Sequence, residues 1–89
     1  MSKAAEPAVT VYTKPACAQC RMTTKWLDKN HIHYKLIDVT KNPEALQHIL
    51  DLGYLAAPVV QVDDKTHWSG FRPDLLNEHV KESDPRANG

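Results

Sequence analysis

Two cysteines separated by two residues are the side chains of this sequence with the clearest chemical potential. They lie in the run Cys17-Ala18-Gln19-Cys20, directly before a stretch of helix-forming residues. At a helix start, unpaired backbone N–H groups and the positive end of the helix dipole stabilise a thiolate over a thiol. Cys17 is therefore the candidate nucleophile. Cys20 comes one helical turn later, where its sulfur can reach Cys17, close a disulfide and act as the resolving thiol.

Metal binding and simple packing are the two alternatives to redox chemistry for this cysteine pair. A C-x-x-C pair is also half of a tetrahedral zinc set, and His31 and His33 follow it in the chain. The gap after Cys20 and the single residue between the histidines do not match the usual zinc spacing. Simple packing of both thiols in the core would not explain why both cysteines lie at the junction between a strand and a helix. We expect redox chemistry and no bound metal.

The elements around the pair predict a strand, a helix and a second strand. The β-branched run 9–13 indicates a buried strand that ends before Lys14-Pro15, and helix formers continue from Ala18 to about Lys29. Residues 32–39 alternate well enough for the second strand. A strand, helix and strand in this order imply parallel pairing with a right-handed crossover.

The second half of the chain predicts a helix, a hairpin and a last helix. Asn42-Pro43-Glu44 has the capping pattern of a helix start, and Gly53 can end that helix. Residues 59–62 and 66–69 indicate two short strands joined by a polar turn. Pro73 and Asp74 start the third helix. The sequence thus predicts an α/β fold with the order βαβαββα.

Length and composition restrict the possible functions. The 89 residues suit one small domain, which we place at 8–82 with flexible tails at 1–7 and 83–89. Eleven basic and eleven acidic residues give a net charge of zero, which argues against nucleic-acid binding. The longest apolar run is far below the roughly 18 residues of a membrane span. Residues 1–8 lack the features of a secretory signal, so we expect a cytoplasmic protein whose thiols are kept reduced. We also expect the protein to be a monomer.

The order of elements, with C-x-x-C at the first junction and a proline before the hairpin, resembles the thioredoxin fold and its shortest branch, the glutaredoxins. Within that branch, the run Trp68-Ser69-Gly70-Phe71-Arg72-Pro73-Asp74, together with the cysteine motif, is similar to the NrdH-type redoxins. This resemblance implies a four-stranded mixed sheet flanked by three helices. It also implies a dithiol-disulfide oxidoreductase that acts as an electron carrier.

The resemblance further implies partners and roles. Such a carrier is reduced by thioredoxin reductase and reduces the large subunit of class Ib ribonucleotide reductase. Its only redox group is the Cys17-Cys20 disulfide, and NADPH and FAD enter only through the partner reductase. In the family, the first cysteine attacks the partner disulfide and the second resolves it. Pro58 matches the family's cis-proline, so we expect a cis Ala57-Pro58 bond with the Ala57 backbone available to a partner strand.

Two alternative functions remain. Ordinary glutaredoxins carry Pro-Tyr between their cysteines and Gly-Gly with acidic residues before the last helix, and both regions differ here. Lys14 nevertheless stands at a position associated with the glutathione carboxylate, so a glutathione-dependent glutaredoxin acting as a general disulfide reductant is one alternative. A thioredoxin-fold adaptor that binds partners without turnover is the other.

Several residues near the pair are expected to contact partners, and the Cys17 sulfur itself to be exposed. Gln19 is expected to donate a hydrogen bond to a sulfur or to a partner backbone, and Gly70 to allow a tight turn. Trp68 and Phe71 either form an apolar patch or complete the core. Arg72, together with Lys14 and Arg21, is expected to favour acidic partner segments. The full expected partner-binding set is Lys14, Gln19, Ala57, Pro58, Trp68, Gly70, Phe71 and Arg72.

Overall fold

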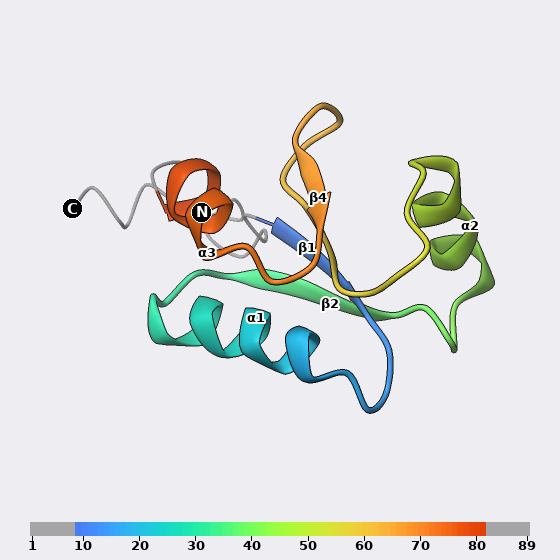
Figure 1. Cartoon of the computed structure of the whole chain (residues 1–89), viewed down its shortest axis with the longest axis horizontal. Helices are drawn as coiled ribbons and strands as arrows, with labels where there is room; N and C mark the ends of the chain where they lie inside the picture. Colours follow the sequence, from blue (N-terminus) through green and yellow to red (C-terminus); the bar gives the residue numbers. More distant parts are fainter. Residues whose placement is uncertain (1–8, 82–89) are drawn as a thin grey trace, which may run out of the picture.

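A four-stranded mixed sheet forms the centre of the fold in the computed structural model, which describes residues 9–81. The strands are β1 (Val9–Thr13), β2 (Tyr34–Asp38), β3 (Val59–Gln61) and β4 (His67–Ser69), in the spatial order β2-β1-β3-β4 (Figure 1). β1 pairs parallel with β2 and antiparallel with β3, and β3 pairs antiparallel with β4. The predicted tails and the outermost residues of the predicted domain, 8 and 82, lie outside the described residues.

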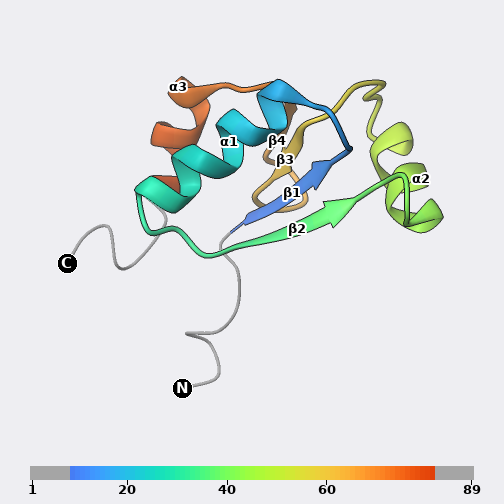
Figure 2. The same ribbon diagram turned by 90° about the horizontal axis from the view of Figure 1, so that it is seen from below.

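Three helical regions cover this sheet. They are α1 (Ala18–Lys29), α2 (Pro43–Asp51) and α3 (Pro73–Leu75), which continues as the π-helical segment η2 (Leu76–Lys81). In Figure 2, α1 and α3 lie together above the strands, and α2 lies beyond the carboxyl ends of β1 and β2. The order βαβαββα and the mixed sheet with its helices confirm the predicted fold.

Alternating strand residues supply two separate apolar cores. On the face covered by α1 and η2, Val11 and Val60 pack with Leu27 and Leu76, all fully buried. The core under α2 is smaller and consists of Tyr12, Val39, Ala45, Ile49 and Val59. Side chains of neighbouring strand residues point to opposite faces, so β1 and β3 each contribute to both cores. The cysteine pair lies where β1 leads into α1.

The second, third and fourth strands are shorter than predicted, the fourth only by Thr66 at its start. The alternation of residues 32–39 predicts a strand that includes Ile32 and Val39, but β2 includes neither of them. The Ile32 N–H bonds to the Leu27 carbonyl, closing α1, and the Val39 N–H bonds to the Thr13 carbonyl where β1 ends. Both side chains are nevertheless buried, so the apolar signal came from core packing beside the strand. Val62 likewise falls in the hairpin turn, where its N–H bonds to the Thr66 carbonyl.

The local signals around α2 and the following loop are confirmed. The Asn42 side chain accepts a hydrogen bond from the Ala45 N–H at 3.0 Å, as a helix cap does. Gly53 has φ +96°, which suits glycine after a helix end. The Ala57-Pro58 peptide bond is cis, as predicted. Across residues 9–81, the helices are too short and too polar to cross a bilayer.

Candidate redox site

Cys17 and Cys20 form a disulfide at the start of α1, with their Cα atoms 5.2 Å apart. Cys17 is the residue that caps the helix, in an extended backbone conformation with φ −116° and ψ 106°. The Cys20 N–H donates a hydrogen bond to Cys17 Sγ at 3.2 Å. The first sulfur therefore occupies the place of a helix-capping oxygen, where it can receive one of the unpaired N–H groups of the first turn.

The surroundings of Cys17 favour a thiolate when the disulfide is reduced. The first turn of α1 contains no acidic residue, so no side chain there opposes the positive end of the helix dipole. Both cysteine residues are buried, because Cys17 is 9% exposed and Cys20 is 3% exposed. The expectation of an openly exposed Cys17 is therefore wrong. This residue is largely covered because the chain before β3 lies against it.

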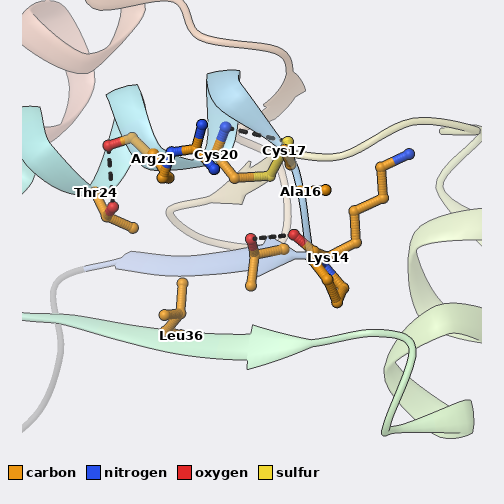
Figure 3. A pocket seen from close by; sticks show the side chains of 9 residues that line it. Lys14, Ala16, Cys17, Cys20, Arg21, Thr24 and Leu36 are labelled. Atoms are coloured by element: carbon orange, nitrogen blue, oxygen red, sulfur yellow. Dashed lines mark hydrogen bonds between the residues drawn. A yellow bond between two sulfur atoms is a disulfide. The ribbon is translucent and has the colours of Figure 1, made fainter.

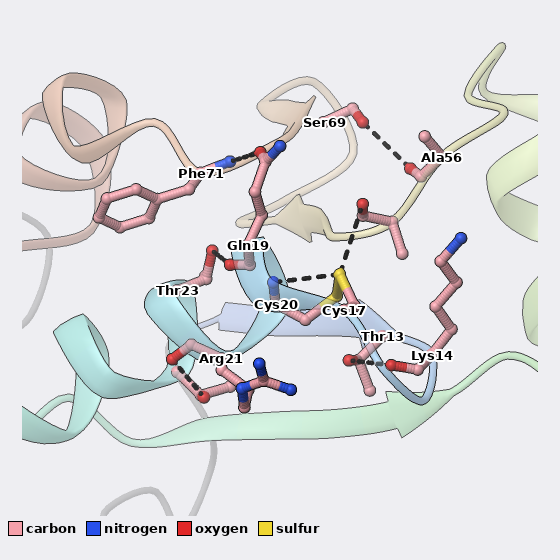
Figure 4. Close-up of a disulfide and its surroundings, with 12 residues drawn as sticks. Thr13, Lys14, Cys17, Gln19, Cys20, Arg21, Thr23, Ala56, Ser69 and Phe71 are labelled. Atoms are coloured by element: carbon pink, nitrogen blue, oxygen red, sulfur yellow. Dashed lines mark hydrogen bonds between the residues drawn. A yellow bond between two sulfur atoms is a disulfide. The ribbon is translucent and has the colours of Figure 1, made fainter.

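The covering residue is Ala57, which reaches the site from the loop between α2 and β3. Its carbonyl oxygen lies 3.7 Å from Cys17 Sγ (Figure 4). In the disulfide this is a contact without a proton, whereas a Cys17 thiol has an S–H to donate to the carbonyl. Pro58 follows and is buried, with its own carbonyl accepting from the Gly70 N–H at 2.8 Å. The structure thus brings Ala57 and Pro58 to the cysteine pair.

Gln19 links α1 to the loop before α3. Its side-chain oxygen Oε1 accepts a hydrogen bond from the Phe71 N–H at 3.0 Å. Gly70 has φ +91°, and a Cβ at this position would lie 3.3 Å from the same oxygen. Donation by the Gln19 amide nitrogen to a sulfur or to a partner stays a prediction, and the structure adds a role for the side-chain oxygen within the protein. This oxygen holds the loop, and the tight approach explains the glycine.

We expect Gln19→Ala to loosen this loop without unfolding the protein. The Phe71 N–H loses its acceptor, so its hydrogen exchange should quicken about fivefold, and the free energy of unfolding should fall by about 1 kcal/mol. Amide exchange measured by NMR and urea titration check these values. Gln47→Ala is the matched control, because it removes only the exposed bond from Gln47 to Asp51 on α2. Equal Phe71 exchange in both variants would contradict the proposed link.

The remaining aromatic and basic residues of the predicted set divide into buried and exposed ones. Trp68 is 6% exposed and belongs to the larger core, so the surface-patch interpretation of this residue is corrected. Phe71 is half-buried against the same core, and Figure 4 shows its ring turned away from the disulfide. The Arg72 guanidinium contacts the Asp74 carboxylate at 3.0 Å. This hydrogen-bonded pairing lowers the pKa of Asp74 and raises that of Arg72.

Two cavities lie near the redox site, and the first of them borders the cysteine pair. The first, about 270 Å³, lies between α1 and β2, with the disulfide at its edge and Leu36 of β2 opposite (Figure 3). Exposed Lys14 and Arg21 also line it. The second, about 190 Å³, lies between Lys14, α2 and the Ala57 loop. Its rim is apolar, because Leu46, Leu50 and Leu55 on this side are all exposed.

Sequence reasoning missed the side chains that anchor the Ala57 loop. The Ser69 hydroxyl donates to the Ala56 carbonyl at 3.0 Å, and the Tyr54 hydroxyl lies 2.7 Å from His67 Nδ1. The available signal was strand alternation, because a buried Trp68 in β4 places its two neighbours on the opposite face. That signal depends on knowing that Trp68 is core, which the sequence left open.

Within residues 9–81, no three or more His, Cys, Asp or Glu side chains are grouped so that they could hold a metal ion. The reactive groups are the two sulfurs, joined in a short loop at a helix start beside a buried proline. A disulfide in this position of a sheet with the order β2-β1-β3-β4 defines a thioredoxin-fold thiol-disulfide oxidoreductase.

Comparison with known proteins identifies the branch. The glutaredoxin family model matches residues 9–68. The glutaredoxin-like protein NrdH of Lactococcus lactis subsp. cremoris is 43% identical over 76% of this chain and 93% of its own length. NrdH of Escherichia coli is 36% identical over 78% of this chain and 84% of its own. The chain belongs to the glutaredoxin family, as an NrdH-type glutaredoxin-like protein.

A solved structure agrees with this assignment. The NrdH-redoxin from Escherichia coli superimposes with a TM-score of 0.74 at 36% sequence identity, covering 79% of this chain and 91% of that one. That protein is described as a glutaredoxin-like protein with a thioredoxin-like activity profile. The likeness therefore extends to the sheet, the helices and the order in which they follow one another.

Proposed function

We propose that this protein is a cytoplasmic, monomeric electron carrier that thioredoxin reductase reduces and that in turn reduces class Ib ribonucleotide reductase. The observation that carries the proposal is the disulfide at the start of α1, with the Ala57 backbone 3.7 Å from Cys17 Sγ. One side of Cys17 supplies thiolate stabilisation, and the other supplies a backbone edge on which a partner chain can dock. NADPH and FAD belong to the reductase.

The reaction is a two-step exchange of sulfur bonds. In the reduced protein, the Cys17 thiolate attacks one sulfur of the partner disulfide, and the other partner sulfur leaves as a thiolate. The Cys20 thiol then loses its proton and attacks Cys17 Sγ in the mixed disulfide. The Cys17-Cys20 bond forms, the partner is released as a dithiol, and two electrons have moved to it. The reductase restores both thiols in the same way.

Two contacts within the protein disfavour glutathione as the electron source. The side-chain oxygen of Gln19 is already bound to the Phe71 N–H, and Arg72 is paired with Asp74. A tripeptide recognised through several weak polar contacts would have to displace these partners or do without them. Losing two such contacts lowers affinity by about 10- to 30-fold.

The apolar rim beside Ala57 supports a protein partner. Leu46 and Leu50 are each 40% exposed and Leu55 is 91% exposed, and all three border the smaller cavity with Ala57. Covering apolar side chains of this kind is favourable for a folded protein but offers little to a small polar peptide. The thioredoxin-like activity profile of the Escherichia coli relative agrees with this choice of partner.

The second candidate is a glutathione-dependent glutaredoxin that reduces disulfides generally. The family match and the exposed Lys14 next to the site favour it. A lysine in this place is free to pair with a carboxylate, because no salt bridge among the described residues involves it.

NADPH consumption with a disulfide substrate separates the two candidates. We expect rapid consumption with a thioredoxin reductase from a bacterium that has an NrdH-type redoxin, and at least about tenfold slower consumption with glutathione and glutathione reductase. An ordinary glutaredoxin, assayed in parallel, shows that the glutathione system is active. A preference for glutathione of about tenfold would reject the carrier proposal in favour of the second candidate.

A further inference from the structure

The segment Tyr54–Ala57, here called the Ala57 segment, packs on the smaller core through Tyr54. It belongs to no helix or strand, Leu55 is 91% exposed, and Ala56 is exposed as well. The segment nevertheless places the Ala57 carbonyl 3.7 Å from Cys17 Sγ, across 40 residues of sequence. Beyond Tyr54 the segment has few apolar contacts, and loop backbone of this kind is usually mobile, so polar anchors are needed to hold it at the sulfur.

The side-chain anchors come from β4 and from Tyr54 itself. The Tyr54 hydroxyl lies 2.7 Å from His67 Nδ1 and donates to the His67 carbonyl at 3.1 Å. The Ser69 hydroxyl donates to the Ala56 carbonyl at 3.0 Å. His67 and Ser69 are alternate residues of one strand, so both project from the face opposite to Trp68. The strand that buries Trp68 in the core therefore also carries the anchors of the Ala57 segment.

We propose that Tyr54 and Ser69 are positioning residues that hold the Ala57 backbone against Cys17 before a partner polypeptide arrives. This inference rests on the proposed function, because it concerns the docking edge used by a disulfide-containing polypeptide. An edge that is already ordered loses less conformational entropy when a partner strand pairs with it. The anchors thus act on partner binding, and the sulfur chemistry stays with Cys17 and Cys20.

Tyr54 is the informative residue because its hydroxyl makes two contacts with His67, one with the ring nitrogen Nδ1 and one with the backbone carbonyl. A substitution of His67 would remove the ring nitrogen but leave the backbone carbonyl in place, so the anchor would persist in part. Tyr54→Phe removes both bonds and keeps the ring, which packs edge-on against the His67 ring with centroids 5.6 Å apart. Tyr34→Phe is the matched control, because it removes one exposed phenol bond, to Asp28.

The first measurement is hydrogen exchange at the two hydrogen-bonded amides that flank the exposed part of the Ala57 segment. They are the Tyr54 N–H, which bonds to the Ile49 carbonyl, and the Gly70 N–H, which bonds to the Pro58 carbonyl. We expect exchange at both to quicken about fivefold in Tyr54→Phe and further in Tyr54→Phe combined with Ser69→Ala. The Tyr34→Phe control should exchange like the wild type at these positions. Exchange in the double variant equal to that in the control would overturn the proposal. This measurement needs no partner protein, so it decides the positioning role even if the proposed function fails.

The second measurement follows the oxidation of pre-reduced protein in a single turnover. With insulin as the polypeptide disulfide, the half-saturating concentration should rise about fivefold in Tyr54→Phe, while the maximal rate stays within about twofold of the wild type. With 5,5′-dithiobis(2-nitrobenzoate), which needs no backbone docking, the rate should not change. A matching loss with both disulfides would overturn the docking role. A wild type that reduces neither disulfide would instead reject the proposed function.

Discussion

Cys17→Ser is expected to abolish disulfide reduction, and Cys20→Ser to leave the first attack intact and trap a mixed disulfide with the substrate. Only Cys17 Sγ has the position of a helix cap, where the Cys20 N–H stabilises a thiolate. Without Cys20, no second thiol remains to resolve the mixed disulfide. Mass spectrometry of each variant after incubation with a disulfide substrate gives the result, and reduction by Cys17→Ser should fall by at least about 1000-fold.

Both variants should remain folded, so the comparison is of chemistry. A serine oxygen at position 17 is a preferred helix cap and can accept the Cys20 N–H in place of the sulfur. Circular dichroism and thermal unfolding of the two variants, each compared with reduced wild type, check this. If Cys17→Ser traps the mixed disulfide and Cys20→Ser does not, the two roles are reversed.

Leu27→Ala is expected to lower the free energy of unfolding by about 3 kcal/mol. Leu27 is fully buried on α1 and packs in the core shared by β1, β3 and η2, so the substitution removes several carbon atoms from a filled interior. In a domain of this size, such a loss corresponds to a fall in Tm of about 15 °C. Urea and thermal unfolding of the oxidised protein give both values.

Leu55→Ala serves as the control for this prediction. Its side chain is 91% exposed, so the same chemical change should alter the free energy of unfolding by less than about 0.5 kcal/mol. Similar losses in the two variants would show that α1 does not depend on Leu27 for its packing. The difference between the two changes in the free energy of unfolding therefore reports the effect of burying the leucine side chain.

Local signals in the sequence were enough to predict the elements and the cysteine pair. Asn42 caps α2 by a hydrogen bond to the N–H of Ala45, only three residues further along the chain. The C-x-x-C spacing likewise allows a disulfide within one helical turn. Pro58 was predictable as a cis residue through family resemblance. Such features depend on a few neighbouring residues or on one motif, so a single sequence contains the information needed.

The contacts that shape the site were not predictable in the same way. The bond from Phe71 to Gln19 spans 52 residues, and those from Ser69 to Ala56 and between Tyr54 and His67 each span 13. These bonds form only after β4 has paired with β3 and the loop before α3 has packed against the start of α1. Propensity and periodicity describe an element by itself, so they do not indicate which distant backbone atom a side chain will meet.

The division of the strands between two cores has a consequence for strand register. β3 sends Val60 to the larger core and Val59 to the smaller one, and β4 buries Trp68 while Ser69 reaches the Ala57 segment. A slip of one residue between them would exchange both faces at once, burying Ser69 and exposing an indole. Such a shifted pairing leaves neither face satisfied. Residues on both faces of the hairpin therefore fix its register. Because Ser69 of β4 holds the Ala57 segment, the same register also determines where the docking edge lies relative to Cys17.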